Sequence, residues 1–373
     1  MKDDNKILVI KIGTSSLTNP KGDLDDGKID LFVKQVVEIH KTHQLVIVTS
    51  GAIAAGFRKL GYQNRPTTTS GKQASAAVGQ GYLMQAYTKR LEAAGILCAQ
   101  ILLTRDDFYD KRRYQNAYST LRALLSKKVI PIINENDTVA IEELHFGDND
   151  TLSAQVAAMI HAHQLLILTD VDGLYTGDPT KDPNAKKIDQ VVTIDHNIEA
   201  MAKPTSNKNA TGGMLSKIHA ARIATRCGVE VIITTIKNKQ SLIELLKNPS
   251  LGTCFLPQAS SLSLKRQWLS YYSQIKGTII VDQGAALALT QRQTSLLPKG
   301  IVEVRGVFLK GDCVEVLDEK LQPLGRGLSA YNSEQLNRII GLNSEAIAKV
   351  FPRGKKVAIH RDDWLEEGRI KHE

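Results

Sequence analysis

Cysteine is scarce in this chain, with four residues among 373. The four are far apart in the sequence and no Cys-x-x-Cys pair occurs, so the sequence supports neither a metal knuckle nor a redox motif. The histidines form no metal-ligand pattern with one another or with cysteine. Zinc-dependent and thiol-redox chemistry are therefore not indicated.

Long apolar runs are also missing. No stretch of the sequence approaches the roughly 18 residues that a membrane-spanning helix needs. The first six residues are polar and do not read as a secretory signal. Free thiols without an export signal are typical of the cytosol, so we expect a cytoplasmic protein with no membrane partner.

The common nucleotide-binding motifs are absent. Gly71-Lys72 is followed by Gln73, where a Walker motif needs Ser or Thr. Gly79-Gln80-Gly81 fails the dinucleotide fingerprint because Met84 stands where the last glycine belongs. The phosphate-loop NTPases and the NAD-dependent dehydrogenases are thereby excluded.

Basic residues are in moderate excess, with 48 basic against 39 acidic side chains and a net charge of +9. Such an excess suits an anionic substrate such as a nucleotide. No dense run of Lys and Arg appears, and residues 277–355 hold ten basic and eight acidic side chains. RNA binding is therefore not the favoured interpretation.

Short apolar runs rich in branched residues alternate with stretches of helical spacing in the first 255 or so residues. Continuous apolar strands indicate burial on both faces, hence a mainly parallel sheet with helices on each side. We predict an α/β three-layer sandwich. Its expected strands are 7–12, 45–49, 96–103, 129–133, 165–169 and 229–234.

The sequence pattern changes after residue 276. Short predicted strands in which apolar and polar residues alternate begin there, and glycines separate them. We expect a small β-rich domain there. The predicted organisation is an α/β domain at 1–258, a linker at 259–276, the β-rich domain at 277–355 and a C-terminal tail at 356–373.

Two clusters of carboxylates and amides stand out, at 134–137 and 147–150. The first follows the fourth apolar run and the second opens a stretch of helical spacing. Asn149 or Asp150 could simply cap that helix. The density of polar groups exceeds what capping requires, so we favour a binding site for a lysine, a metal ion or a substrate amine.

Two segments pair a lysine with small residues, as phosphate sites do. Lys11 and Gly13 follow the first run, and residues 211–217 lead Lys217 into a helix. The ordinary alternatives are a strand-end turn with a solvated lysine and a capped helix with an exposed one. Residues 203–213 also read as a loop that closes over a ligand.

The second and fifth apolar runs are also followed by candidate ligand contacts. Ser50 and the glycines of 50–56 could hold a carboxylate, although on this motif alone a helix-capping serine is favoured. Thr169 and Asp170 could contact a ribose or base, or could form a turn. The spacing alone leaves these alternatives open.

Taken together, these motifs resemble the glutamate 5-kinases, members of the amino-acid kinase family with a C-terminal PUA domain. The matching segments occur in the same order over nearly the whole chain. They are 9–15, 46–56, 133–137, 146–150, 168–170, 173–176, 211–217, 295–300, 331–333 and 360–363.

The resemblance implies ATP-dependent phosphorylation of the side-chain carboxylate of L-glutamate to glutamyl 5-phosphate, the first intermediate toward proline. Lys11 and Lys217 would stabilise the moving phosphoryl group and Asp150 would orient them. Glutamate would be bound by Ser50, Gly51, Ala52, Asn134, Asp137, Asp148 and Asn149. ATP would be bound by Lys11, Gly13, Thr169, Asp170, Thr211, Gly212, Gly213, Met214, Leu215, Ser216 and Lys217.

The resemblance further implies Mg²⁺ as the companion of ATP, with ligands that the sequence does not identify. It also implies inhibition by proline near the glutamate site and a homo-oligomer, dimer or tetramer, formed through the kinase domain. The nearest alternatives are kinases for acetylglutamate, aspartate, carbamate or a nucleoside monophosphate. The polar cluster 134–137 suits a free amino group, which acetylglutamate lacks.

Overall fold

The chain forms two compact units in the computed structural model. One comprises Met1–Phe108 with Arg112–Ser261, and the other comprises Tyr109–Lys111 with Leu262–Glu373. The residues that the structure describes are 6–140, 149–179, 181–202, 213–235, 242–258, 268–269, 273–292, 294–352 and 354–367.

The first unit is built around an eight-stranded sheet in the order β3-β4-β2-β1-β5-β9-β10-β8. All neighbouring strands are parallel except β9 and β10, which confirms the mainly parallel sheet. The strands are β1 (Ile7–Ile12), β2 (Gln44–Val48), β3 (Cys98–Leu103), β4 (Ile130–Glu135), β5 (Gln164–Thr169), β8 (Gln190–Val191), β9 (Glu230–Thr235) and β10 (Thr253–Phe255). A separate two-stranded ribbon joins β6 (Leu174–Tyr175) to β7 (Lys187–Ile188).

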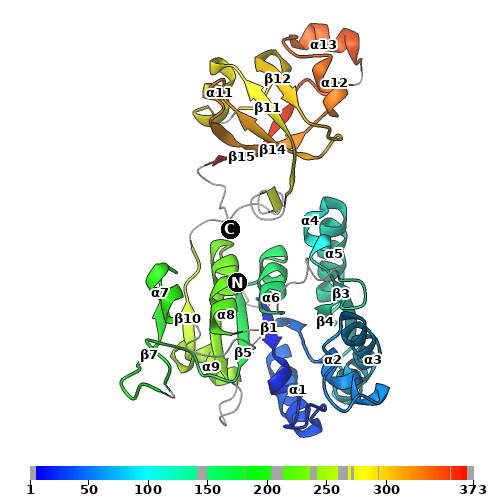
Figure 1. Ribbon diagram of the computed structural model, residues 1–373, viewed down its shortest axis with the longest axis vertical. Helices are drawn as coiled ribbons and strands as arrows, with labels where there is room; N and C mark the ends of the chain where they lie inside the picture. The colour runs from blue at the N-terminus through cyan, green and yellow to red at the C-terminus, as the bar shows by residue number, and fades with distance from the viewer. Residues whose placement is uncertain are drawn as a thin grey trace. The chain divides into compact units, whose positions relative to one another are not determined.

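Helices cover both faces of this sheet, so the expected three layers are present (Figure 1). On one face, helices α1, α3 and α9 pack on inward-facing residues of the central strands. On the other face, α6 packs on β1 and β5, and α8 packs beside α6 and on β9. The helices are α1 (Asp26–His40), α2 (Ala52–Gly56), α3 (Thr69–Ala93), α4 (Asp106–Tyr109), α5 (Lys111–Ser126), α6 (Asn149–Met159), α7 (His196–Met201), α8 (Met214–Arg226) and α9 (Leu242–Lys247).

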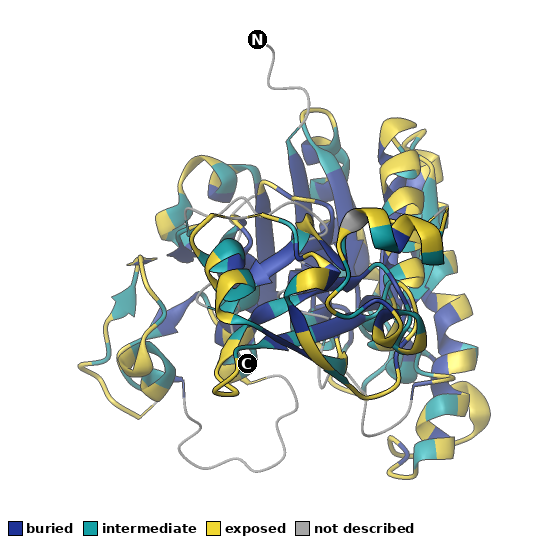
Figure 2. Ribbon diagram, turned by 90° about the horizontal axis from the view of Figure 1, so that it is seen from above, coloured by how far each residue is buried: buried dark blue, intermediate teal, exposed yellow. Residues whose placement is uncertain are grey.

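The buried residues concentrate in the central strands, while the outer faces of the helices are exposed (Figure 2). Every residue of β1 and β5 is buried, as the continuous apolar runs predicted. The register places Lys11, near the end of β1, between Val48 of β2 and Ile167 of β5. The carboxyl ends of β1, β2, β4 and β5 therefore meet at one edge of the sheet, where open α/β sheets bind ligands.

The second unit is a five-stranded sheet in the order β12-β11-β13-β14-β15, with its own apolar core. Its strands are β11 (Ile275–Val281), β12 (Ile301–Arg305), β13 (Cys313–Leu317), β14 (Pro323–Ser329) and β15 (Ile359–Glu366). Its helices are α11 (Gln283–Thr290), α12 (Ser333–Asn337) and α13 (Ser344–Val350). The expected β-rich C-terminal domain is thus present.

The expectation that residues 356–373 form a separate tail is corrected by β15. This strand pairs antiparallel with β14, from Gly325↔Glu366 to Ser329↔Ile359. Ile359 and Trp364 are buried in the core of the second unit. The strand was not recognised from the sequence because its middle residues, His360, Arg361 and Asp362, are polar and exposed to solvent.

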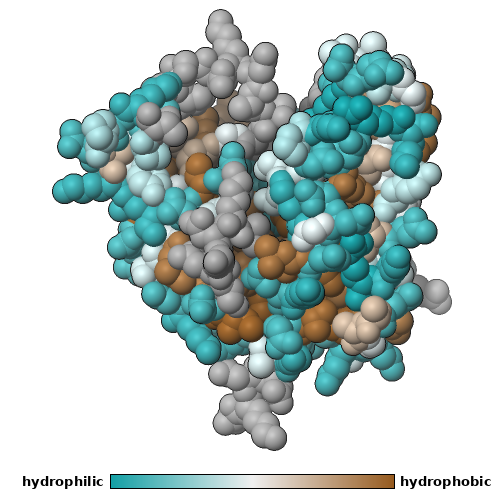
Figure 3. Space-filling view, turned by 90° about the horizontal axis from the view of Figure 1, so that it is seen from below, coloured by the Kyte–Doolittle hydropathy of each residue, from teal (hydrophilic) through white to brown (hydrophobic). Residues whose placement is uncertain are grey.

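No helix among the described residues is both long and apolar enough to cross a membrane. The molecular face in Figure 3 is largely hydrophilic, with smaller hydrophobic areas between the polar side chains.

Candidate functional site

A cavity of about 670 Å³ opens at the carboxyl edge of the sheet in the first unit. It brings together most of the residues singled out from the sequence, although they come from six separate segments. Those that line it are Lys11, Gly13, Ser50, Gly51, Ala52, Asn134, Asp137, Asn149, Thr169, Asp170, Gly213 and Lys217.

The remaining candidates have different positions. Asp150 is completely buried and supports the lysines from behind the cavity wall. Met214, Leu215 and Ser216 belong to the first turn of α8 and do not line the cavity. Asp148, Thr211 and Gly212 lie outside the described residues, as does the proposed closing loop at 203–213 except for its last residue.

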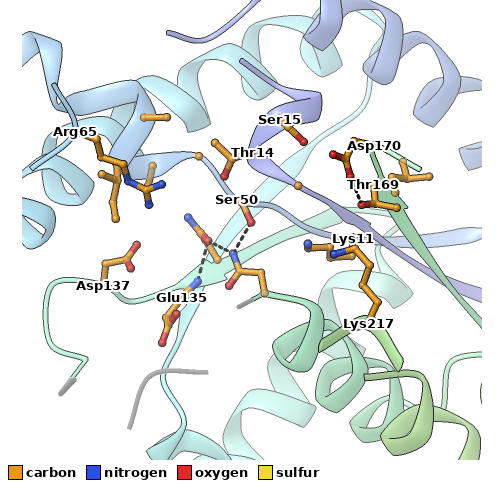
Figure 4. Close-up of a pocket in the computed structure, with 18 of the residues that line it drawn as sticks. Lys11, Thr14, Ser15, Ser50, Arg65, Glu135, Asp137, Thr169, Asp170 and Lys217 are labelled. Atoms are coloured by element: carbon orange, nitrogen blue, oxygen red, sulfur yellow. Dashed lines mark hydrogen bonds between the residues drawn. The ribbon is translucent and has the colours of Figure 1, made fainter. Parts of the chain in front are cut away.

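The centre of the site is one carboxylate shared by two lysines. Lys11, on β1, forms an ion pair with one oxygen of Asp150, and the Nζ of Lys217, on α8, lies 3.0 Å from the other. The Oγ of Ser216 donates to the same Asp150 oxygen at 3.2 Å. Figure 4 shows the two lysine side chains next to each other at the cavity wall.

Both lysines are buried, so neither is the solvated side chain that the ordinary alternative supposed. Lys11 is 6% exposed and Lys217 is 5% exposed. Burial by itself would raise the pKa of Asp150, but the charges and hydrogen bonds of Lys11 and Lys217 outweigh it and hold that pKa below its ordinary value. Two cations and one anion leave a net positive centre beside the cavity.

Asn149, the first residue of α6, joins the ends of β2 and β4 through its side-chain amide. Its Nδ2 lies 2.6 Å from the Thr49 carbonyl oxygen, 3.0 Å from the Ser50 Oγ and 2.9 Å from the Asn134 Oδ1. Two of these contacts are dashed in Figure 4 beside Ser50. The side chain therefore reaches across the sheet edge and links the loop after β2 to β4.

Gln80, a residue that the motifs did not reveal, extends this amide network. Its Oε1 accepts from the Asn134 Nδ2 at 2.9 Å, and its Nε2 donates to the Gln100 Oε1 at 3.1 Å. Asn134 and Gln80 are both buried. Gln80 is 20 residues from Gln100 and 54 residues from Asn134 in the sequence, so no local pattern could have identified the network.

The loop after β2 presents Ser50 to the cavity and does not use it as a helix cap. Gly51 is the N-cap residue of α2 and no side chain caps that helix. Gly51 has φ = 102°, a conformation that glycine adopts without strain. Ser50 is thereby free to accept the hydrogen bond from Asn149, against the capping role that its motif favoured.

The opposite side of the cavity has the features of an anion site. Gly213 is the N-cap of the 13-residue helix α8, and as a glycine it has no side chain to cap the first N–H groups. Helix N-termini of this kind attract phosphate groups. Thr169 and Asp170 follow β5 on this side, and the Thr169 hydroxyl donates to the Asp170 carboxylate at 3.0 Å.

Three further charged side chains line the cavity without having been assigned a role from the sequence: Arg65, Lys72 and Glu135. Glu135 is the last residue of β4, so the strand extends two residues beyond its predicted end. Arg65 precedes α3 and Lys72 is in its first turn. Short-range motifs could not connect Arg65 and Lys72 to the site, because only the fold brings residues 65–72 to the sheet edge.

The chain is similar to known proteins over most of its length. Residues 6–235 match the amino acid kinase family and residues 277–351 match the PUA domain. The glutamate 5-kinase of Streptococcus pneumoniae is 50% identical over 362 residues, which are 96% of each chain. The glutamate 5-kinase of Neisseria meningitidis is 48% identical with the same coverage.

A solved structure shares the fold of the first unit. The carbamate kinase from Giardia lamblia bound to AMP-PNP aligns with a TM-score of 0.51 at 17% identity. The alignment covers 68% of this chain and 99% of the carbamate kinase chain.

Proposed function

The chain belongs to the amino acid kinase family, and on this premise we propose that it transfers the terminal phosphoryl group of ATP to the side-chain carboxylate of L-glutamate. The product would be glutamyl 5-phosphate, the first intermediate of proline biosynthesis. The observation that carries the proposal is the buried Lys11–Asp150–Lys217 group, which lies between the amide-rich end of the cavity and the α8 N-terminus.

Phosphoryl transfer to a carboxylate depends more on electrostatic stabilisation of the transition state than on proton transfer. A side-chain carboxylate has a pKa of about 4.3 and is already ionised at neutral pH, so it needs no general base. The barrier arises because two anions must approach and charge develops on the moving phosphoryl group. Lys11 and Lys217 stabilise that charge, and Asp150 holds both ammonium groups in place.

The two ends of the cavity suit the two reactants. Ser50, Asn134 and Asn149 offer hydroxyl and amide groups, and Asp137 offers a carboxylate for the ammonium group of an amino acid. Thr169, Asp170 and the first turn of α8 would contact ATP. In this arrangement the acceptor carboxylate and the γ-phosphate meet at the two lysines.

The described residues fit Mg²⁺ as a companion of the nucleotide and not as a resident ion. They contain no group of three His, Cys, Asp or Glu side chains placed to hold a metal. Mg²⁺ is commonly bound by substrate phosphates with one or two carboxylates, and Asp170 is the carboxylate on the nucleotide side. When bound, the ion would offset phosphate charge.

The test is an assay of ADP release with L-glutamate, aspartate, N-acetylglutamate, carbamate and UMP as acceptors. We expect turnover with L-glutamate that exceeds turnover with every other acceptor. A preference for another acceptor, or no release with glutamate above the acceptor-free background, would refute the proposal.

We further infer that proline inhibits by occupying the acceptor end of the cavity. Proline carries an α-amino and an α-carboxyl group as glutamate does, but it has no side-chain carboxylate to phosphorylate. Competition predicts that proline raises the KM for glutamate and leaves kcat unchanged. A fall in kcat at saturating glutamate would contradict this binding mode.

We also propose a homo-oligomer, a dimer or tetramer, assembled through the first unit. The support is the exposed apolar side chain of Leu97, which directly precedes the edge strand β3 and is 64% exposed. Light scattering on the purified chain should give a mass of two or four copies. A monomer at micromolar concentration would contradict the proposal.

A further inference from the structure

Two cationic side chains in the cavity wall have no role in the mechanism described above. Arg65 and Lys72 line the cavity, and both are exposed. Within the part of the chain that the structure describes, neither side chain has a hydrogen bond or an ion pair with another residue. This distinguishes them from Lys11 and Lys217, whose charges are shared with Asp150.

Arg65 lies at the acceptor end of the cavity. Figure 4 shows its guanidinium group on the same side as Asp137, with Ser50 between this end and the two catalytic lysines. Thr169 and Asp170 lie on the far side. A nucleotide held near Thr169 would therefore place its phosphates at the lysines and leave Arg65 for the other reactant.

The segment that carries these two cations is anchored by close helix packing. Lys72, Ala76 and Gly79 lie on one face of α3, at positions i, i+4 and i+7. At Gly79 this face touches α2, because an added Cβ would overlap the Ala52 carbonyl oxygen. Helix α2 begins directly after the Ser50–Gly51 loop. The start of α3 is thus fixed beside the serine that faces the acceptor.

Arg65 is held by the packing of its neighbour. Pro66 is buried, and it restricts the preceding residue to extended backbone conformations. An added Cβ on Gly71 would lie 2.8 Å from the Pro66 Cβ and 2.8 Å from the Thr68 Oγ1, so this turn is tightly packed on the helix start. The backbone on which Arg65 stands is therefore defined, while its charged group remains available for a ligand.

We propose that Arg65 and Lys72 bind the α-carboxylate of the acceptor amino acid; this inference rests on the proposed function. Glutamate carries two carboxylates and one ammonium group. The side-chain carboxylate must reach Lys11 and Lys217, so the α-carboxylate needs other cations. Arg65 can receive it through paired hydrogen bonds, Lys72 adds a second charge, and Asp137 receives the ammonium group.

The charge pattern also gives the enzyme a way to select its substrate. A free α-amino acid presents one positive and one negative group at the end remote from the reaction. Asp137 and Arg65 match them with one negative and one positive group. Acceptors without the α-carboxylate would leave the two cations without a counter-ion in the complex, which opposes the binding of such acceptors.

The test compares L-glutamate with L-isoglutamine, in which the α-carboxylate is an uncharged amide. The variants are Arg65→Ala and Lys72→Ala, and the matched control is Lys89→Ala, an exposed lysine on the same helix outside the cavity. We expect each cavity variant to raise the KM for glutamate about 10- to 100-fold, as loss of a hydrogen bond to a charged group does. The KM for ATP and the kcat should change little.

The ratio of kcat/KM for glutamate to that for isoglutamine should fall by about tenfold or more in each cavity variant and stay constant in Lys89→Ala. An unchanged KM for glutamate, equal losses for both acceptors, or a rise confined to the KM for ATP would overturn the inference. Failure of the proposed function is a separate result, because there the unaltered protein would release no ADP with glutamate.

Discussion

At the scale of single residues, Asp150 determines how the site responds to pH. Its depressed pKa means that the folded protein binds a proton there less readily than the unfolded chain. Asp150 therefore contributes stability above its unfolded pKa of about 3.9, and that contribution is lost as the pH falls through the lower folded value. The contribution is thus fully present at neutral pH.

Asp150→Asn should reduce the free energy of unfolding by about 3 kcal/mol at neutral pH, because it leaves two buried ammonium groups without their carboxylate. Urea denaturation of both proteins at several pH values measures the effect. The difference between them should shrink on acidification below about pH 4. A difference that stays constant down to the lowest pH at which both fold would contradict this role.

Lys217→Met should lower kcat about 100-fold, because it removes one of the two charges that stabilise the phosphoryl group while keeping most of the side-chain volume. Steady-state kinetics at saturating ATP and glutamate measure it. Lys247→Met, at the end of α9 and outside the cavity, is the control. Near-normal kcat in Lys217→Met would remove this lysine from the mechanism.

At the scale of helices and strands, the crossing of α2 and α3 depends on two glycines. An added Cβ on Gly56 would overlap the backbone of Ser75, and one on Gly79 would overlap the backbone of Ala52. These helices carry the Ser50 loop and the segment with Arg65 and Lys72. The packing distance of one helix pair thereby sets the width of the acceptor end.

Gly79→Ala should destabilise the protein by about 1–3 kcal/mol, as overpacking does, and raise the KM for glutamate because the Ser50 loop must move. Gly81→Ala is the matched control on the same helix, because an added Cβ there meets no other atom within 4 Å. That variant should gain about 0.5–1 kcal/mol. Thermal denaturation of both variants tests the contrast, and equal effects would argue against it.

The strands could be predicted because buried parallel strands read as continuous apolar runs, and all six expected strands of the first unit exist. The Lys11–Asp150–Lys217 group and the amide network were harder to anticipate. Each depends on pairings between distant segments, such as Asp150 with Lys217. Lysine burial in particular reverses the usual preference of this side chain for solvent, and the local patterns left burial and exposure of the two lysines open.

At the scale of the whole molecule, the catalytic apparatus belongs to one unit. Every residue that lines the cavity comes from the first unit, whose sheet ends with β10 at Phe255. The second unit has a separate sheet and core. We therefore propose that residues 1–261 suffice for the phosphoryl transfer.

A chain truncated after Ser261 should keep glutamate-dependent turnover, because it retains the complete sheet and cavity. Activity assays with circular dichroism on the truncated protein measure this. Loss of turnover in a truncated chain that melts cooperatively would show that the second unit contributes to catalysis.

The strand order also bears on the sequence of events during synthesis. Strands β3, β4, β2 and β1 all come from residues 7–135, so half of the sheet can form early. On the ribosome, β1 then exposes an unpaired edge until residues 164–169 emerge as β5. Lys11 belongs to the half that is synthesised first, whereas Asp150 and Lys217 belong to the half that is synthesised later. The Lys11–Asp150–Lys217 group can therefore form only after β5 has paired with β1 and the later residues have folded onto the earlier half.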